Sequence, residues 1–422
     1  MSSQVTAKPS IELSIAGSVN LVEKYEKFEW ISFVNGGYII RGKIDDSWWK
    51  TIRKLATDRY LQKGRLEATP VTFSILWDEN KRTTPRTAIL TELENDGKGA
   101  GGSVTFVGVD PPSYFLNSGD ASGRVYEGRI SDVIKRVVQD YTTQSPTPIT
   151  VEVTKTQDNP QGKWWMMRQD PKTFIRSLLD WSPSICPDKT SWIVASTDFK
   201  IIIREQAEFK GTDFGVFEMN KTGGAKDIEG VELLADSMLT PLQTAIRTAG
   251  ISAVSGQIFT NIQVNDDNTS NKRNVKITAA QGFKKPPSKV EPGSPGGSTY
   301  VTAVPELNGG EMGKNYEEWI DGRARGVFMN MLNMVMRLRI TVDGNHGIDS
   351  SELLGVSTLV VNWNDADDKP YFLGGKWLIY GFHHDCRPKK WKTHLYLARL
   401  DYDAAAKTVL APIREAKASG NL

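Results

Sequence analysis

The chain has 422 residues, of which 39% are hydrophobic and 24% are charged. This composition is typical of a folded globular protein with room for two or three domains. Its 52 basic and 50 acidic residues give a formal charge of +2, which excludes a surface dominated by nucleic-acid-binding positive charge and leaves a local basic patch open.

Strand patterns dominate the N-terminal part of the chain. Alternating and β-branched runs predict strands at 11–16, 28–44, 71–77, 86–93 and 103–109. The turn Asn35-Gly36-Gly37 divides the second of these into a hairpin. We expect a helix over 46–56 with Trp48 and Trp49 on its apolar side, and a glycine-rich loop over 95–102. Pro111-Pro112 ends this unit, so residues 1–112 are predicted to form a first β domain.

A helix–strand–helix segment follows within residues 113–205. The first helix carries Val133, Ile134, Val137, Val138 and Tyr141 along one stripe, and strand formers occupy 149–153. In the second helix, Asp170 is placed to accept hydrogen bonds from free backbone N–H groups as the N-cap, and Pro171 suits the first helical position. Phe174, Ile175, Leu178 and Leu179 repeat the stripe. This segment is scaffolding rather than catalytic chemistry.

The pattern returns to strands in residues 206–402, a predicted second β domain. Strands are expected at 191–195 and 200–205 at the end of the preceding segment, and within this domain at 216–219, 231–235, 253–264, 338–342, 358–363, 376–382 and 393–400. The last two are expected to pair through a turn at 385–390. Residues 286–298, rich in Pro and Gly, predict a flexible loop, and 315–336 predicts the most strongly periodic helix. Residues 403–422 are a short helix or a loose tail.

Each half therefore supplies several strands, one tight turn and one amphipathic helix. We expect a mainly β (α+β) fold with two similar β-barrel domains, an inserted α/β segment and short amphipathic helices. Two distant cysteines, Cys186 and Cys386, without a CxxC motif favour a reducing compartment. The polar N-terminus and the lack of a run of about 18 apolar residues predict neither a signal peptide nor membrane insertion.

The order of these pieces resembles the baseplate hub family of contractile phage tails, which is related to the phage late-control D proteins and VgrG spikes. The resemblance covers about residues 10–402, and its specificity lies in the order and spacing of the pieces. Those pieces are the strands 28–44 and 70–77, the helix start 131–134, Gln169-Asp170-Pro171 leading into 174–179, and the runs 375–381 and 391–399. The structural positions that we single out in them are Ser131, Gln169, Asp170, Pro171, Phe174, Leu178, Trp377 and Gly381.

The resemblance implies two tube-protein-like barrels per chain and a homotrimeric ring that adapts the sixfold tail tube to the threefold central spike. A closed ring would also remove exposed sheet edges. Implied partners are the spike, a tail tube protein or tube initiator, and the baseplate wedge proteins, with DNA only passing through the lumen. The implied location is the virion tail baseplate, assembled in the host bacterial cytoplasm. Because this chain lacks a long C-terminal β-helical spike, a separate spike protein is expected.

Several motifs invite other interpretations. His383-His384-Asp385-Cys386 with His394 suggests a metal site, but adjacent strand residues point to opposite faces, so we favour a hairpin end with partly exposed polar residues. The GxxxG at Gly322 and Gly326 favours close helix packing, and the glycines of 97–102 lack P-loop spacing. In each of the pairs Trp48-Trp49 and Trp164-Trp165 we expect one buried and one interfacial ring.

No pair of carboxylates and no nucleophile–histidine arrangement predicts an enzyme, and we assign no catalytic, cofactor-binding or metal residue. The preferred hypothesis is a structural baseplate hub. One alternative is the hub of a non-phage contractile injection or type VI-like secretion apparatus, which shares the fold and is separated by genome neighbourhood. From another class, a tail-associated cell-wall hydrolase would clear peptidoglycan in a zymogram. A glycan-binding adhesin would lose binding in Trp49→Ala or Trp165→Ala.

Overall fold

The computed structural model describes residues 9–15, 18–22, 25–45, 68–78, 81–95, 102–117, 124–153, 162–166, 169–179, 192–205, 212–219, 226–234, 259–266, 272–278, 299–304, 337–344, 346–363 and 373–398. The predicted helices at 46–56 and 315–336, the loop 286–298 and the tail 403–422 lie outside the described residues.

The N-terminal strands form an antiparallel, curved sheet in the order β3–β4–β8–β7–β5–β1–β2, with the short β6 on β5. Their bounds are β1 (Ser10–Ile15), β2 (Ser18–Val22), β3 (Tyr25–Phe33), β4 (Gly37–Asp45), β5 (Pro70–Asp78), β6 (Lys81–Arg82), β7 (Arg86–Asn95) and β8 (Ser103–Val109). Asn35 lies in the β3–β4 turn with φ 60°, a conformation that asparagine tolerates better than most residues. Phe28 and Trp30 alternate inward along β3, as the period of a strand requires. The predicted hairpin at Asn35–Gly37 is confirmed.

The C-terminal strands close into a barrel of six, if β15 and β16 are counted as one interrupted strand. The ring runs β14–β21–β22–β23–β20–β16, and β15 pairs back onto β14. The bounds are β14 (Asp213–Met219), β15 (Asp227–Ile228), β16 (Gly230–Leu233), β20 (Arg337–Asp343), β21 (Thr358–Asn362), β22 (Gly375–Arg387) and β23 (Lys390–Ala398), with a 3₁₀ turn at Ser351–Leu353.

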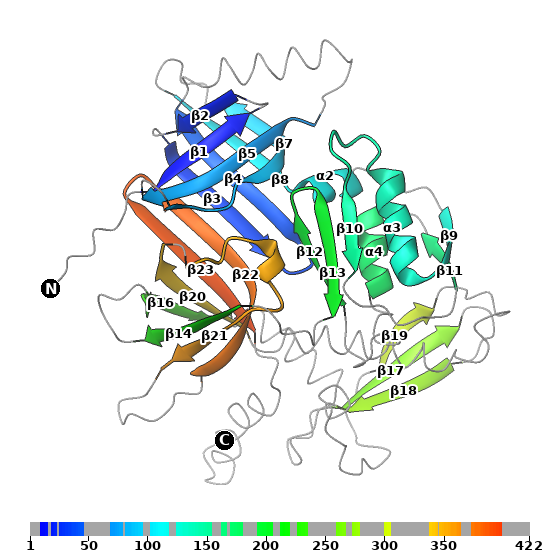
Figure 1. The fold of residues 1–422 in the computed structure, drawn as a ribbon. Helices are drawn as coiled ribbons and strands as arrows, with labels where there is room; N and C mark the ends of the chain where they lie inside the picture. The colour runs from blue at the N-terminus through cyan, green and yellow to red at the C-terminus, as the bar shows by residue number, and fades with distance from the viewer. Residues whose placement is uncertain are drawn as a thin grey trace, which may run out of the picture.

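One long strand joins the barrel to the N-terminal sheet. The first residues of β22 pair with β21, and its later part pairs with β3 from Gly381 opposite Phe33 to Cys386 opposite Phe28. The two halves consequently share one apolar core, in which the Trp30 ring lies 5.1 Å from Phe73 and 5.2 Å from Phe382 in edge-on geometry. Figure 1 shows the blue N-terminal sheet continuing into the orange strands of the barrel.

The helical segment lies beside this sheet (Figure 1). It comprises α2 (Pro111–Asn117), β9 (Arg124–Gly128), α3 (Ile130–Tyr141), β10 (Thr150–Val153), β11 (Gly162–Met166), α4 (Pro171–Leu179), β12 (Trp192–Thr197) and β13 (Lys200–Glu205). Strand β10 pairs in parallel with β13, which forms a hairpin with β12, while β9 and β11 form a ribbon. A further sheet contains β17 (Phe259–Asp266), β18 (Lys272–Thr278) and β19 (Thr299–Val304).

The prediction of a mainly β, barrel-rich α+β fold is confirmed. The domain divisions at 112, 205 and 402 stay predictions, and the first of them falls inside α2. The predicted turn at 385–390 is wrong in extent: β22 continues to Arg387 and β23 begins at Lys390, because the hairpin turns within two residues. Among the described residues, no helix is long and apolar enough to cross a bilayer.

Candidate functional site

The structural positions singled out in the sequence fall into two places. Ser131 lies buried in the first turn of α3, and Gln169, Asp170, Pro171, Phe174 and Leu178 lie on or just before α4. Trp377 and Gly381 lie on β22. The structure thus brings the helical positions into one contacting pair of helices and the other two onto the strand that joins the halves.

The α4 positions build the helix and its buried face. The Asp170 carboxylate accepts hydrogen bonds from the Thr173 backbone N–H at 2.8 Å and from its hydroxyl at 2.6 Å, as an N-cap does. Burial raises the pKa of Asp170, but these hydrogen bonds outweigh it and hold the pKa below its usual range. Phe174 stacks on Tyr126 with ring centres 5.9 Å apart. These contacts build α4 and its buried face, while a family-motif role for these positions stays a prediction.

The β22 positions shape the joint between the two halves. The indole N–H of Trp377 donates to the Leu373 carbonyl at 2.9 Å, which satisfies a polar group on a buried ring. Gly381 faces the ring of Phe33, and a Cβ at this position would lie 2.3 Å from a ring carbon. The missing side chain is what lets β3 and β22 approach at this point.

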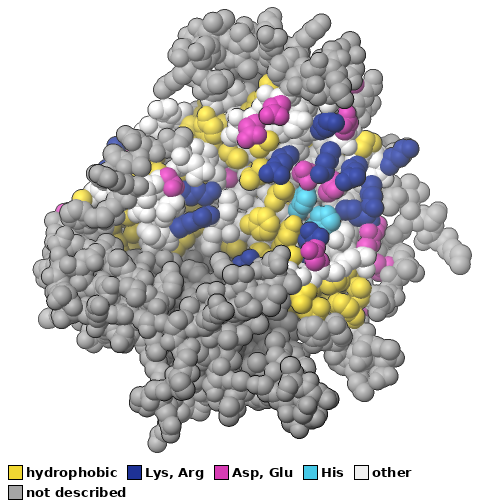
Figure 2. All heavy atoms as spheres, turned by 180° about the vertical axis from the view of Figure 1, so that it is seen from behind, with side chains coloured by type: hydrophobic (Ala, Val, Ile, Leu, Met, Phe, Trp, Pro, Cys, Tyr) yellow, Lys and Arg dark blue, Asp and Glu magenta, His cyan; other side chains and the backbone are white. Residues whose placement is uncertain are grey.

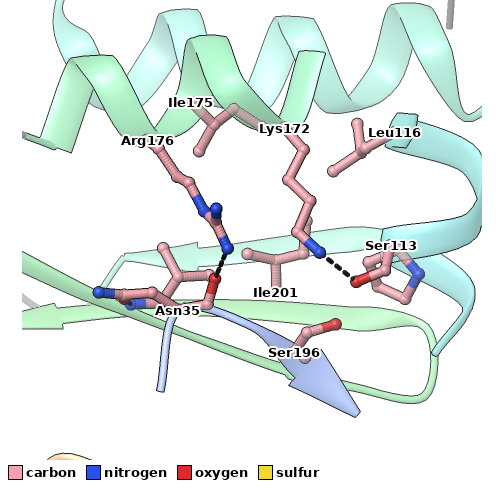
Figure 3. Close-up of a pocket in the computed structure, with 11 residues that line it drawn as sticks. Asn35, Ser113, Leu116, Lys172, Ile175, Arg176, Ser196 and Ile201 are labelled. Carbon is pink, nitrogen blue, oxygen red and sulfur yellow. Dashed lines mark hydrogen bonds between the residues drawn. The ribbon is translucent and has the colours of Figure 1, made fainter. Parts of the chain in front are cut away.

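The opposite face of α4 forms a small apolar-walled pocket against the β3–β4 turn, α2 and β12–β13 (Figure 3). Lys172 and Arg176, one helical turn apart, both reach across it. The Lys172 ammonium donates to the Ser113 hydroxyl at 2.9 Å and to the Gly36 carbonyl at 3.1 Å, and Arg176 donates to the Asn35 carbonyl at 2.6 Å. Lys172 and Arg176 thus each donate to a backbone carbonyl of the β3–β4 turn.

Asp110, which directly precedes α2, accepts hydrogen bonds from three groups near this pocket. Its carboxylate accepts from the backbone N–H groups of Tyr38 at 3.1 Å and Ser113 at 2.9 Å, and from the Ser196 hydroxyl. Burial lowers the pKa of Lys172, and the nearby Asp110 charge opposes that shift. Gly37 has φ +74°, and a Cβ there would lie 2.1 Å from the Asp110 carboxylate, so this position demands glycine. Sequence reasoning missed Lys172 and Arg176 because each acts across a long sequence separation. Asp110 was missed although it caps the Ser113 N–H three positions on, and the Asp110-Pro111 pair at the start of α2 is the local signal that could have found it.

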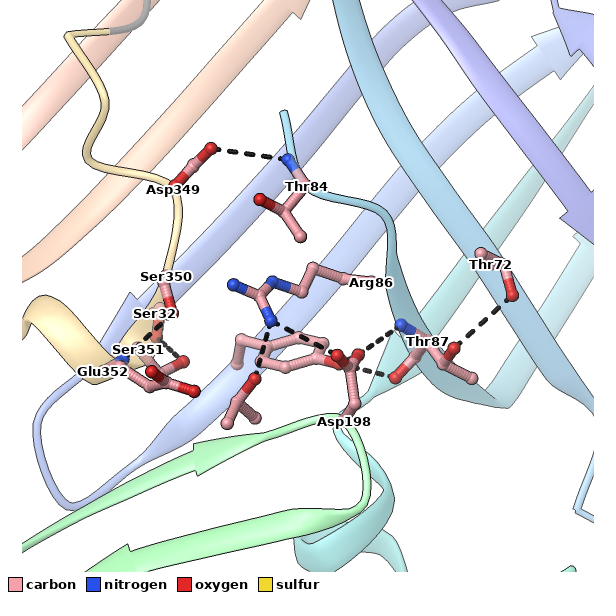
Figure 4. A network of polar contacts seen from close by, with 12 residues as sticks. Ser32, Thr72, Thr84, Arg86, Thr87, Asp198, Asp349, Ser350, Ser351 and Glu352 are labelled. Atoms are coloured by element: carbon pink, nitrogen blue, oxygen red, sulfur yellow. Dashed lines mark hydrogen bonds and ion pairs between the residues drawn. The ribbon is translucent and has the colours of Figure 1, made fainter. Parts of the chain in front are cut away.

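A second polar joint links the β12–β13 turn to β7 (Figure 4). The Arg86 guanidinium donates to the Thr197 hydroxyl at 2.8 Å and forms an ion pair of 3.3 Å with Asp198. The Tyr38 hydroxyl, which donates to the Thr87 carbonyl at 2.5 Å, lies 3.2 Å from the same Asp198 carboxylate. Ser32 and Ser351 form a hydroxyl contact of 2.9 Å between β3 and the barrel. The first set of contacts fixes the inserted segment on the N-terminal sheet, and the Ser32–Ser351 contact links that sheet to the C-terminal half.

The outward face of β20, β23, β22 and β3 combines aromatic, charged and histidine side chains. The rings of Phe33 and Tyr396 lie 4.8 Å apart beside Tyr380, and the Arg337 guanidinium lies 5.1 Å from the Tyr380 ring centre. Figure 2 shows histidine side chains on a face where Lys, Arg, Asp and Glu intermingle next to hydrophobic side chains.

The interpretation of residues 383–386 as a partly exposed hairpin end is wrong for two of them, because the strand continues through them. His384 and Cys386 are fully buried. His384 contacts the Thr393 hydroxyl at 2.8 Å and the Ile348 carbonyl at 3.0 Å, and burial lowers its pKa to about 3. His383 lies on the other face, as the strand period predicts.

This barrel-rich fold is the class of fold seen in tail proteins of phages and prophages. The chain is similar to a tail protein from Neisseria meningitidis MC58 (TM-score 0.57, 11% identity, 94% of this chain and 99% of that one). It is also similar to the 43 kDa tail protein of prophage MuSo2 from Shewanella oneidensis (TM-score 0.53, 10% identity, 94% and 97%).

A third similar structure is the E. coli c3393 protein (TM-score 0.50, 11% identity, 93% of this chain and 78% of that one). That protein is described as a component of the type VI secretion system with structural similarity to the T4 bacteriophage tail proteins gp27 and gp5. No protein-family profile and no curated protein sequence matches the chain. At these identities the comparisons establish a shared fold.

Proposed function

We propose that this chain is the structural baseplate hub of a contractile phage tail. The observation that carries the proposal is the agreement over nearly the full length of both chains with two tail proteins. The described polar clusters support a structural role, because their hydrogen bonds tie α4 to α2 and to the β3–β4 turn, and the β12–β13 turn to β7.

In this role the chain acts as a homotrimer. Three copies, each with two barrel-like halves, supply the quasi-sixfold ring that a sixfold tail tube needs on one side and a threefold spike on the other. The joint between β3 and β22 favours this use, because a sheet continuous across both halves keeps them in fixed orientation when force passes through the ring. The ring encloses the DNA exit channel and contacts the spike, the tube protein or initiator, and the wedge proteins.

The oligomeric state tests the proposal most directly. We expect the full chain, alone or with its spike protein, to have the mass of a trimer by multi-angle light scattering after size exclusion. A particle reconstruction should place it between tube and spike. A chain that stays monomeric at micromolar concentration even with the spike present would contradict the hub role.

A second candidate is the hub of a type VI-like secretion apparatus, favoured by the similarity to the E. coli c3393 protein. Both candidates use the same fold and the same ring. Capsid and terminase genes beside this gene favour the phage hub, whereas secretion-sheath genes without a capsid favour the apparatus.

A further inference from the structure

Two histidines face each other across the β22–β23 hairpin. His383 and His394 are directly opposed in the antiparallel register, and their ring centres lie 5.2 Å apart. A zinc ion bound about 2.1 Å from one nitrogen of each ring, at a roughly tetrahedral angle, places the ring centres about 5 Å apart. The pair therefore already has the separation of a two-histidine chelate.

Each ring is also oriented by a partner that engages one of its nitrogens. His383 Nε2 lies 3.0 Å from the Glu29 carboxylate on β3, and His394 Nδ1 lies 2.9 Å from the Thr341 hydroxyl on β20. These contacts leave Nδ1 of His383 and Nε2 of His394 for a metal. A carboxylate or hydroxyl on the far nitrogen is the usual support of a metal-binding histidine, because it fixes the ring and its tautomer.

The charge around the pair suits a divalent cation. The buried Oδ1 of Asp385 has no hydrogen-bond partner, and the Asp385 charge acts on both imidazoles. The neighbouring cations are already held by carboxylates: Lys27 by Glu29, Lys392 by Glu229 and Asp343, and Arg339 by Glu232. Arg387 pairs at 3.4 Å with the other oxygen of Asp385, Oδ2. The Asp385 charge therefore favours a cation beside the two imidazoles. Both rings are partly exposed on the outward face, which gives an ion access from solvent.

We propose that His383 and His394 form a two-histidine site for a divalent transition metal of the Zn²⁺ class. Glu29 and Thr341 orient the rings and the Asp385 carboxylate balances the charge. No group of three or more His, Cys, Asp or Glu side chains among the described residues is arranged to hold a metal. Water therefore completes the coordination in this proposal. The ion would stabilise the hairpin of β22 and β23 at the place where β3 joins it, a role separate from the hub function.

The test uses the full chain, stripped with a chelator and titrated with Zn²⁺ against a chromogenic competitor. We expect binding with a dissociation constant below millimolar, and a loss of about 10-fold or more in affinity in each of His383→Gln and His394→Gln. His346→Gln removes a histidine outside the pair and should leave the affinity unchanged. Zn²⁺ should raise the melting temperature of the unmodified chain and of His346→Gln, but not of the other two variants.

Thr341→Val provides a check that does not remove a ligand. It deletes only the hydroxyl that orients His394, so it should weaken Zn²⁺ binding less than His394→Gln does while keeping the fold, as judged by circular dichroism. The proposal is overturned if the unmodified chain does not bind Zn²⁺ below millimolar concentration. It is equally overturned if His383→Gln and His394→Gln bind as the unmodified chain does, because the ion would then lie elsewhere.

Discussion

The backbone N–H of Thr87 donates a 2.6 Å hydrogen bond to the carboxylate of Asp198, across 111 positions of sequence. Asp198 lies in the β12–β13 turn with φ 43°, a left-handed conformation that aspartate adopts more readily than most residues. Its carboxylate also faces Arg86 and Tyr38 (Figure 4). Asp198 therefore anchors the β12–β13 hairpin of the inserted segment to β7.

Asp198→Ala should destabilise the protein by about 2 kcal/mol. The substitution leaves the Thr87 N–H without its acceptor. It also places alanine in the left-handed region, where aspartate is tolerated better because its polar side chain can hydrogen-bond locally. Urea unfolding followed by tryptophan fluorescence measures the loss. Asp198→Asn is the matched control, because it keeps an acceptor and tolerates the backbone, and it should lose roughly half as much. Equal losses in the two variants would show that the N–H contact is not what matters.

Gly381→Ala should destabilise the joint between β3 and β22 by about 1–3 kcal/mol, because its new methyl group meets the Phe33 ring. Differential scanning calorimetry would show a lower melting temperature. Gly230→Ala, whose added carbon would lie 3.7 Å from the nearest atom, should change stability by less than about 0.5 kcal/mol. The double variant Phe33→Leu, Gly381→Ala should recover part of the loss, and a double variant worse than either single change would contradict the clash.

Asp170→Ala should cost about 1 kcal/mol, because α4 loses its N-cap. Asp170→Asn keeps a capping oxygen but loses the charge, so at pH 7 it should cost less than the alanine variant without being neutral. The pKa of Asp170 is below its usual range in the folded protein, so its charge contributes stability above the unfolded pKa of about 3.9, and this contribution is lost as the pH falls through the folded value. Urea titrations at pH 7 and pH 3 should show the gap to the alanine variant narrowing; a gap independent of pH would argue that only the neutral cap matters.

His384 should make the protein sensitive to acid. Burial lowers its folded pKa to about 3, whereas an unfolded histidine titrates near about 6.5. The unfolded chain therefore binds a proton that the folded chain does not. As the pH falls below about 6.5, the free energy of unfolding decreases with a slope that approaches about 1.4 kcal/mol per pH unit, until the folded pKa is reached.

The variant His384→Gln isolates this proton from those of the other histidines. The stability advantage of the unmodified chain over it should shrink by about 1 kcal/mol between pH 6.5 and pH 5.5, because the unfolded histidine is already half protonated at the upper value. Urea midpoints at the two pH values provide the measurement. Arg41→Ala changes an exposed residue on β4, which is separated from β22 by β3. It should leave the dependence of the unfolding free energy on pH unchanged. A constant difference between the unmodified chain and His384→Gln would mean that His384 takes up its proton in the folded state as well.

Local signals predicted the elements of this protein well where the chain itself carries the cause. The cap at Asp170, the turn at Asn35 and the alternation of β3 each depend on residues within a few positions, and all three are present. The strand β9 and the edge strand β2 were missed, because strands of five residues are too short to give a clear periodic signal.

The candidate sites were harder to predict, because their residues act through distant partners. Lys172 belongs to an amphipathic helix, and nothing nearby in sequence shows that its ammonium meets Ser113 and Gly36. The opposition of His383 and His394 depends on a two-residue turn, and the longer turn predicted at 385–390 leaves that register undefined. Strand period alone did separate His383 from His384.

The sequence by itself determined the strand and helix content, the inserted helical segment and the caps and turns, because these follow from dihedral preference and apolar spacing over a few residues. Tertiary structure alone decided that β22 joins both halves, that β10 pairs in parallel with β13 and β14 with β21, and that Asp198 accepts from the Thr87 N–H. Strand pairing and buried polar contacts are chosen among many partners of similar local pattern, and only the packing of the whole core selects one.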